Sequence, residues 1–344
     1  MEKNKNEAIE KALSEYVRQL SNDLDLSAEE VLDALKDALL SAVRKELDIP
    51  KEEASNAIRI EGNGSNLKVL VMRQYCDNGI CEDEALEDWV EFPLSSLSRV
   101  SVQTAENTLK NRMNEKSKEK AIKRIAQFAG EVVTAKVIRK DPKTRLVLLD
   151  VDGVECVLEP ADQLPTDRYI PGETIRCLVL GAKNIPQYGQ GVSLSRSSPE
   201  LLRALFTLEV PEVADGVVRI MGVARKPGRR SKVAVMSIDP RLDPQGACIG
   251  YKGQRIQAIS KSLANEKIDV VRWDTDPVKL IENVLSPGKV DKVEITDPKS
   301  KIALVHTSSD NIKVVVGEDG ENVELAEQLT GWTIDVREGD ADEN

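Results

Sequence analysis

Two short glycine loops carry the residues of this sequence that are best suited to chemistry. Residues 250–253 read Gly-Tyr-Lys-Gly, and residues 317–320 read Gly-Glu-Asp-Gly. Glycines at both ends of such a loop let the main chain turn sharply and approach a sugar-phosphate backbone, because a Cβ there would stand between the backbone amides and the phosphate. The chemistry that this spacing predicts is phosphate binding, with Lys252 and Arg255 adding positive charge at the first loop.

The two loops belong to an internal repeat. Each loop is followed by an amphipathic helix and then by Ile-Asp-Val, at residues 268–270 after the first loop and 334–336 after the second. A Gly-x-x-Gly loop between two helices is typical of the KH domain, in which the loop binds about four nucleotides through their backbone. The sequence therefore predicts two tandem KH domains of the prokaryotic type, a first repeat at 199–276 and a second repeat at 277–344.

The segment around the first loop is basic although the chain as a whole is acidic. The formal net charge is −11, yet ten basic and only two acidic residues fall between Arg219 and Lys261. Because phosphate affinity grows with the number of cations in contact, we expect the first repeat to bind RNA. The expected RNA-binding residues are Gly250, Tyr251, Lys252, Gly253, Arg255, Arg225, Lys226, Arg229, Arg230 and Lys232.

The second loop has the opposite charge. Its middle residues are Glu318 and Asp319, and ten acidic residues face a single basic one between residue 317 and the end of the chain. Carboxylates repel phosphate. We expect Gly317 and Gly320 either to bind RNA more weakly or to serve only the shape of the loop.

Short strands at regular intervals precede the repeats. They are expected at 131–140, 145–151, 154–160, 174–182 and 191–195, which predicts a five-stranded OB-type barrel. Such barrels bind oligonucleotides, but many are only structural. The only aromatic residues here are Tyr169 and Tyr188, so both direct base contact and a structural role remain open for the barrel.

The N-terminal part predicts a helical α+β domain. Ser27 and Glu30 have the spacing of a capping box before an apolar stripe, and apolar runs at 57–62 and 67–72 flank an Asn-Gly turn signal. A long charged helix is expected over about 104–128, where it would connect this domain to the barrel.

This order of elements resembles the NusA family along nearly the whole chain. The stretches LLRALFTLEVPEVADGVV, ARKPGRRSKVAV, DPQGACIGYKGQRIQAI and LTGWTIDV are similar to sequences of that family. The acidic second loop differs from the basic loop usual there, and the chain resembles the short members without C-terminal acidic repeats. We therefore expect a multidomain α+β protein with domains at 1–128, 129–198 (a barrel of the S-one type), 199–276 and 277–344.

The resemblance also implies partners and an activity. The N-terminal domain would bind core RNA polymerase near the RNA exit channel, while the barrel and the KH domains would follow the nascent single-stranded RNA. Other antitermination factors are further expected partners. Such a factor would alter pausing, hairpin folding, termination and antitermination without catalysing a reaction.

Two other functions compete with this interpretation. The first is an RNA-binding protein or RNA chaperone that acts without polymerase, and only the N-terminal domain distinguishes it. The second is an RNA-processing enzyme or a KH-bearing GTPase. The sequence has no G-x-x-x-x-G-K-[ST] loop, and its single histidine, His306, offers no acid–base set of the usual kind.

We expect no catalytic residue, cofactor or metal. The five cysteines are an odd, scattered set that fits a reducing compartment, and Cys76 and Cys81 are expected to be free thiols. No run of about 18 apolar residues and no apolar signal segment occurs in the sequence. The prediction is a cytoplasmic protein, a monomer, with no membrane association.

Overall fold

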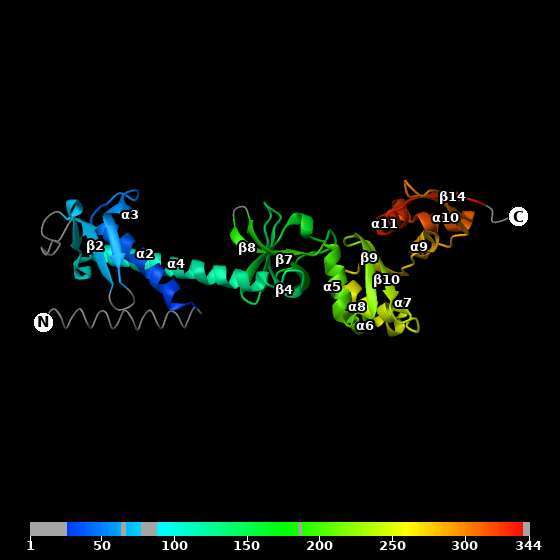
Figure 1. Cartoon of the computed structure of the whole chain (residues 1–344), viewed down its shortest axis with the longest axis horizontal. Helices are drawn as coiled ribbons and strands as arrows, with labels where there is room; N and C mark the ends of the chain where they lie inside the picture. The colour runs from blue at the N-terminus through cyan, green and yellow to red at the C-terminus, as the bar shows by residue number, and fades with distance from the viewer. Residues whose placement is uncertain (1–25, 63–66, 77–87, 186–187, 340–344) are drawn as a thin grey trace. The chain divides into compact units, whose positions relative to one another are not determined.

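The computed structural model describes residues 26–62, 67–76, 88–185 and 188–339. The chain divides into two compact units, residues 1–121 and residues 122–344 (Figure 1). None of the helices in these described ranges combines the length and the apolar composition that a membrane crossing demands.

The N-terminal unit packs a capped helix against a small antiparallel sheet. The Ser27 hydroxyl accepts a hydrogen bond from the Glu30 amide at 3.2 Å, and the Glu30 carboxylate accepts one from the Ser27 amide at 2.8 Å, which confirms the capping box. The sheet order is β1-β2-β3. The elements are α2 (Ala28–Glu46), α3 (Ala54–Ala57), β1 (Ile58–Glu61), β2 (Lys68–Met72), η1 (Arg73–Tyr75), β3 (Trp89–Glu91) and η2 (Leu94–Ser96).

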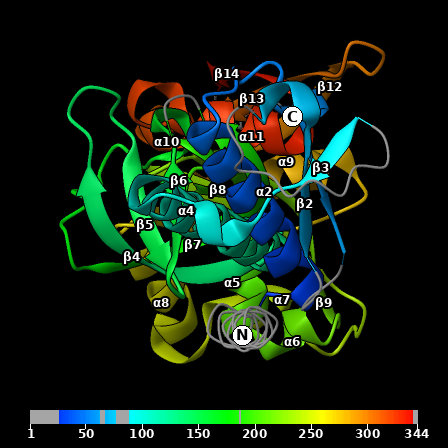
Figure 2. The same cartoon turned by 90° about the vertical axis from the view of Figure 1, so that its left-hand side faces the viewer.

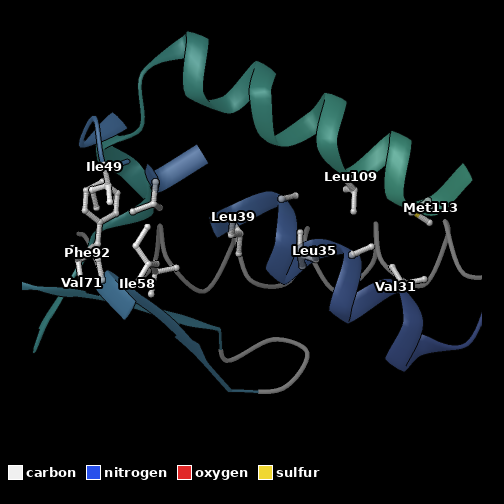
Figure 3. Packing of buried hydrophobic residues seen from close by; sticks show 14 of the residues in the cluster. Val31, Leu35, Leu39, Ile49, Ile58, Val71, Phe92, Leu109 and Met113 are labelled. Atoms are coloured by element: carbon white, nitrogen blue, oxygen red, sulfur yellow. The ribbon is translucent and has the colours of Figure 1, made fainter. Parts of the chain in front are cut away.

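The expected hairpin is present, because β1 and β2 pair antiparallel with Ile58 opposite Val71. Its turn lies outside the described residues. The long helix α4 (Arg99–Ala126) begins earlier than the sequence pattern suggested. Figure 3 shows Leu109 and Met113 of α4 pointing toward α2, where both belong to one buried apolar cluster with Val31.

The cysteines differ from the expectation at one position. Cys76 is disulfide-bonded, so the prediction of a free thiol there is wrong; Cys81 lies outside the described residues. Cys156, Cys177 and Cys248 are free and buried. Burial raises the pKa of each of these three thiols to about 12, which keeps them protonated and unreactive near neutral pH.

Five strands close into the predicted barrel, in the order β4-β5-β6-β8-β7 (Figures 1 and 2). Closure comes from antiparallel pairing of β4 with β7 and parallel pairing of β6 with β8. Asp152 and Gly153 both have positive φ in the β5–β6 turn, as a tight hairpin requires. The elements are β4 (Val132–Lys140), β5 (Val147–Val151), β6 (Val154–Leu158), η3 (Pro160–Asp162), β7 (Thr174–Ile185) and β8 (Gly189–Ser195).

The first repeat packs its helices beside a three-stranded sheet, and the loop 250–253 joins α7 to α8. Strand β10 is central, antiparallel to β9 and parallel to β11. Its elements are α5 (Pro199–Glu209), α6 (Pro211–Ala214), β9 (Val218–Lys226), β10 (Arg230–Ser237), α7 (Pro244–Ile249), η4 (Tyr251–Gly253), α8 (Gln254–Ser262) and β11 (Lys267–Arg272).

The second repeat has the same topology. Strand β13 is central, antiparallel to β12 and parallel to β14. Its elements are α9 (Pro277–Val284), β12 (Lys292–Asp297), β13 (Ile302–Thr307), α10 (Ser309–Val316), η5 (Glu318–Gly320), α11 (Glu321–Thr330) and β14 (Thr333–Glu338).

Helix α11 of the second repeat packs on the sheet of the first. Ala224 and Ala234 of that sheet share one apolar cluster with Leu325 and Leu329 of α11. The approach is close, since a Cβ added at Gly222 would lie 2.8 Å from Leu329 Cδ1. The two repeats therefore share a core.

Candidate nucleic-acid interface

The loop 250–253 has a backbone that its glycines make possible. Gly250 has φ 75° and ψ 173°, and Gly253 has φ 75° and ψ 15°. These are conformations that side chains with a Cβ rarely adopt. At Gly250 a Cβ would also lie 2.8 Å from Arg255 Cγ. The loop turns within four residues because both glycines are in place.

Neighbouring residues hold this loop in a single shape. The Asp243 carboxylate caps α7 by accepting hydrogen bonds from the amides of Gln245 and Gly246, at 3.3 and 3.0 Å. Arg255 Nη1 donates to the Ala247 carbonyl at 2.6 Å and to Glu212 Oε2 at 2.8 Å, so this side chain ties α8 to α7 and α6. Arg255 therefore positions the loop while its charge is matched by a carboxylate.

The two middle residues point into solvent. Tyr251 is 75% exposed, the highest fraction among the large apolar and aromatic side chains in the described ranges. Lys252 is exposed as well, and its Nζ lies 5.4 Å from the centroid of the Tyr251 ring. The loop thus offers a cation and an aromatic ring together, at a place where the backbone can approach a phosphate.

Arg225 is buried, whereas the sequence led us to expect it on an exposed RNA-binding surface. Its side chain is fully buried and forms a two-pronged ion pair with the equally buried Glu266, with both N–O distances at 2.9 Å. A third bond runs from Arg225 Nη1 to the Ser198 carbonyl at 2.6 Å. A buried, fully bonded guanidinium holds the fold together and cannot contact phosphate.

Lys232 is also buried, which corrects a second expectation. Its Nζ donates to the Ser286 carbonyl at 2.8 Å and lies 3.3 Å from Asp269 Oδ2. Burial lowers the pKa of this ammonium to about 8, although the Asp269 carboxylate opposes the shift. Arg230 Nε donates to the same carboxylate at 2.8 Å, so that two predicted RNA contacts share one half-buried carboxylate.

Lys226 and Arg229 each pair with an acidic residue of the second repeat. Lys226 Nζ forms an ion pair with Glu324, and Arg229 Nε lies 3.2 Å from Glu321 Oε1. Both carboxylates belong to α11. The side chain of Arg229 is still 56% exposed, so its charge is paired but remains in contact with solvent.

The loop 317–320 repeats the backbone of the first loop with other side chains. Gly317 has φ 79° and ψ 171°, Asp319 has φ 52° and ψ 27°, and Gly320 has φ 75° and ψ 8°; the corresponding Lys252 has φ 48° and ψ 29°. Asn322 Nδ2 donates to the Val315 and Leu285 carbonyls at 2.9 Å and so fixes this loop from below.

The barrel adds a basic hairpin that the sequence-based interpretation overlooked. Exposed cations follow one another at the turn from β4 to β5, namely Arg139, Lys140, Lys143 and Arg145. Lys140 and Arg145 line a cleft of about 520 Å³. The signal was present as four cations within seven residues, but it was hidden because the two repeats dominate the charge pattern.

The two tyrosines of the barrel are both engaged in the fold. Tyr169 is only 5% exposed, and its hydroxyl accepts a hydrogen bond from the Leu164 amide at 2.8 Å. The Tyr188 hydroxyl donates to Asp141 Oδ2 at 2.7 Å, which is the main reason that the pKa of Asp141 falls to about 2. The ring of Tyr169 is therefore buried, whereas Tyr188 is half-buried against the apolar cluster that contains Leu148 and Ile185.

No group of three or more His, Cys, Asp or Glu side chains in the described part of the chain is arranged to hold a metal ion.

Family models match the N-terminal part of the chain and both repeats. Residues 12–119 match the NusA N-terminal domain, residues 196–273 match the NusA-like first KH domain, and residues 277–344 match the NusA-like second KH domain. The match to the two KH models agrees with the tandem repeat seen in both sequence and structure.

Several relatives are each named transcription termination/antitermination protein NusA. The protein of Thermus thermophilus is 36% identical over 95% of this chain and 89% of its own length. That of Mycobacterium tuberculosis H37Rv is 35% identical over 93% of this chain and 90% of its own length. That of Bacillus subtilis is 32% identical over 92% of this chain and 88% of its own length.

Proposed function

The chain belongs to the NusA family of transcription termination/antitermination proteins, and we propose on this premise that it binds nascent single-stranded RNA through the loop 250–253 of its first KH domain. Its N-terminal domain holds it on core RNA polymerase. From that position it alters pausing, RNA hairpin folding and termination by binding alone. It acts in the bacterial cytoplasm as a monomer, with other antitermination factors as further partners.

One observation carries the RNA-binding part of this proposal. Lys252 and Tyr251 are exposed on a backbone whose glycines leave room for a phosphate. Glycine at both ends of the turn, a cation between them and the following helix α8 are the features by which KH loops bind the sugar-phosphate chain. The proposed contacts are Gly250, Tyr251, Lys252 and Gly253.

The remaining predicted residues have other roles in the proposal. Arg255 positions the loop through Ala247 and Glu212, and Arg229 pairs with Glu321 of the second repeat. The other predicted cations form ion pairs within the two repeats, namely Arg225, Lys226, Arg230 and Lys232. Gly317 and Gly320 shape a loop whose exposed Glu318 and Asp319 disfavour phosphate.

The polymerase part is supported by the N-terminal match at residues 12–119. A tethered RNA-binding domain needs little intrinsic affinity, because a short linker holds it near its target at an effective concentration on the order of millimolar. A factor attached to polymerase can therefore bind a transcript segment as it emerges and compete with its folding into a hairpin.

The test is a pull-down of bacterial core RNA polymerase with the full chain after nuclease treatment, paired with termination assays on a hairpin terminator. We expect polymerase capture without RNA, and a change in termination that Lys252→Ala weakens while polymerase capture stays intact. Loss of capture after nuclease treatment, with RNA affinity retained, would instead identify an RNA-binding protein that acts apart from polymerase.

A further inference from the structure

We propose that Tyr251 is a stacking platform for one unpaired RNA base, so that the first loop recognises a nucleotide by its base and its phosphate together. This inference rests on the proposed RNA binding of the loop. It adds the chemical feature that the loop selects: a base that is neither paired nor stacked in a duplex.

The exposure of Tyr251 is the first observation behind this proposal. Tyr251 is 75% exposed, which leaves a large apolar area in contact with water. Within the described part of the chain, the Tyr251 hydroxyl takes part in no hydrogen bond. Ile249, two residues earlier, is also 37% exposed and adds apolar surface next to the loop.

The second loop shows that the fold does not require this tyrosine. Glu318 occupies the equivalent position, and the backbone of that loop has nearly the same angles at all three measured residues. Since an acidic side chain supports the same turn, the ring of Tyr251 is not needed to form it. An exposed aromatic ring on a phosphate-binding loop is suited to stack on a base.

The position of Lys252 completes a binding surface for one nucleotide. Its Nζ lies over the Tyr251 ring, 5.4 Å from the ring centroid, so the cation sits against one face of the ring. The loop is held by Arg255 and by the capped helix α7, so the ring is presented without ordering a flexible segment first.

Stacking of this kind predicts a particular selectivity. Every base has a π-face, so the platform tolerates any sequence and favours larger rings only modestly. In a duplex each base is already stacked and paired, and its face is not accessible. Tyr251 should therefore favour single-stranded RNA over duplex RNA of the same charge.

The decisive experiment compares the salt dependence of two single variants in the full chain, with fluorescein-labelled oligoadenylate as the probe. Tyr251→Ala should weaken binding by about ten-fold, the loss of one base stack, with an unchanged slope of log affinity against log salt. Lys252→Ala should instead reduce that slope by about 0.7, the value for one phosphate contact on a single strand. Tyr251→Phe should bind like the parent, and circular dichroism should show the same melting curve for all variants.

Each alternative result has a definite meaning. Binding by Tyr251→Ala within two-fold of the parent, or a slope that falls along with its affinity, would overturn stacking and leave the proposed phosphate binding in place. A parent chain that shows no salt-dependent binding to oligoadenylate would overturn the RNA-binding function itself. A further comparison uses abasic RNA of the same length as the probe. The platform would be supported directly if the parent chain binds the probe more tightly than the abasic RNA and Tyr251→Ala binds both with equal affinity.

Discussion

The loops 250–253 and 317–320 join corresponding helices of two similar domains, and their backbones differ little. Lys252 and Asp319 occupy the same position with φ 48° and 52°, although one carries a positive and the other a negative charge. The glycines and the residues below the turn set the path of the chain, with Arg255 in the first domain and Asn322 in the second. The residues at 251–252 and 318–319 can therefore differ in charge without changing the path of the backbone.

This pair of loops also separates two kinds of cation in the first domain. Lys252 is exposed on the loop, whereas Arg225 and Lys232 are buried in the sheet with carboxylate partners. A charge count along the sequence treats all three alike. Their energetic roles differ because a buried ion pair is part of the core, while an exposed cation is available to a phosphate.

The largest effect is expected from the buried cation. Arg225→Ala leaves the Glu266 carboxylate buried without its partner, which should cost about 3–5 kcal/mol of unfolding free energy. Lys252→Ala, as the matched exposed change, should alter stability by less than about 0.5 kcal/mol. Urea unfolding of the full chain measures both. A stable Arg225→Ala protein with a selective loss of RNA affinity would return Arg225 to the RNA-binding surface.

A double substitution tests whether the side chains alone account for the expected difference in RNA affinity between the two loops. Tyr251→Glu combined with Lys252→Asp gives the first loop the sequence of the second and should lower RNA affinity about 100-fold, because a stacking ring and a cation are replaced by two carboxylates. The melting temperature should not change, since the second loop already forms with these residues. Retained affinity in titrations of labelled RNA would show that RNA binds elsewhere, for example at the basic hairpin of the barrel.

A single glycine substitution tests close backbone approach. Gly253→Asp should fold, because the nearest atom to a new Cβ is Gln257 Nε2 at 3.5 Å and aspartate tolerates the left-handed region better than most residues. The added carboxylate should lower RNA affinity about ten-fold, the loss expected for one phosphate contact. Gly320→Asp in the second loop is the matched control and should leave binding unchanged. Equal effects at both glycines would mean that both loops contact RNA.

The smallest effect concerns the acidic residues of α11. Glu321→Gln with Glu324→Gln removes the carboxylates paired with Arg229 and Lys226, and should raise RNA affinity about two- to three-fold with a steeper salt dependence. Stability should fall only slightly, because partly exposed ion pairs contribute about 0–1 kcal/mol. Glu338→Gln, an exposed acid at the end of β14, controls for net charge. An equal gain in that control would rule out a specific role of α11.

The architecture of this protein could be predicted from its sequence. The capping box at Ser27, the five barrel strands and the tandem loops follow from local signals, because propensity, hydrophobic period and glycine placement act over a few residues. The spacing of Gly250 and Gly253 is a local signal of the same kind. The expectation at Cys76 failed because the odd number of cysteines says nothing about which of them pair.

Which cations are paired and which are exposed depends on the tertiary structure. Arg225 pairs with a glutamate 41 residues away, Arg230 with an aspartate 39 residues away, and Lys226 with a glutamate 98 residues away in the other repeat. Burial and pairing depend on how strands and helices pack, and no local pattern encodes the distance between residues that meet through the fold. Lys252 is left exposed because its loop lies at the end of two helices, where none of the described elements covers it.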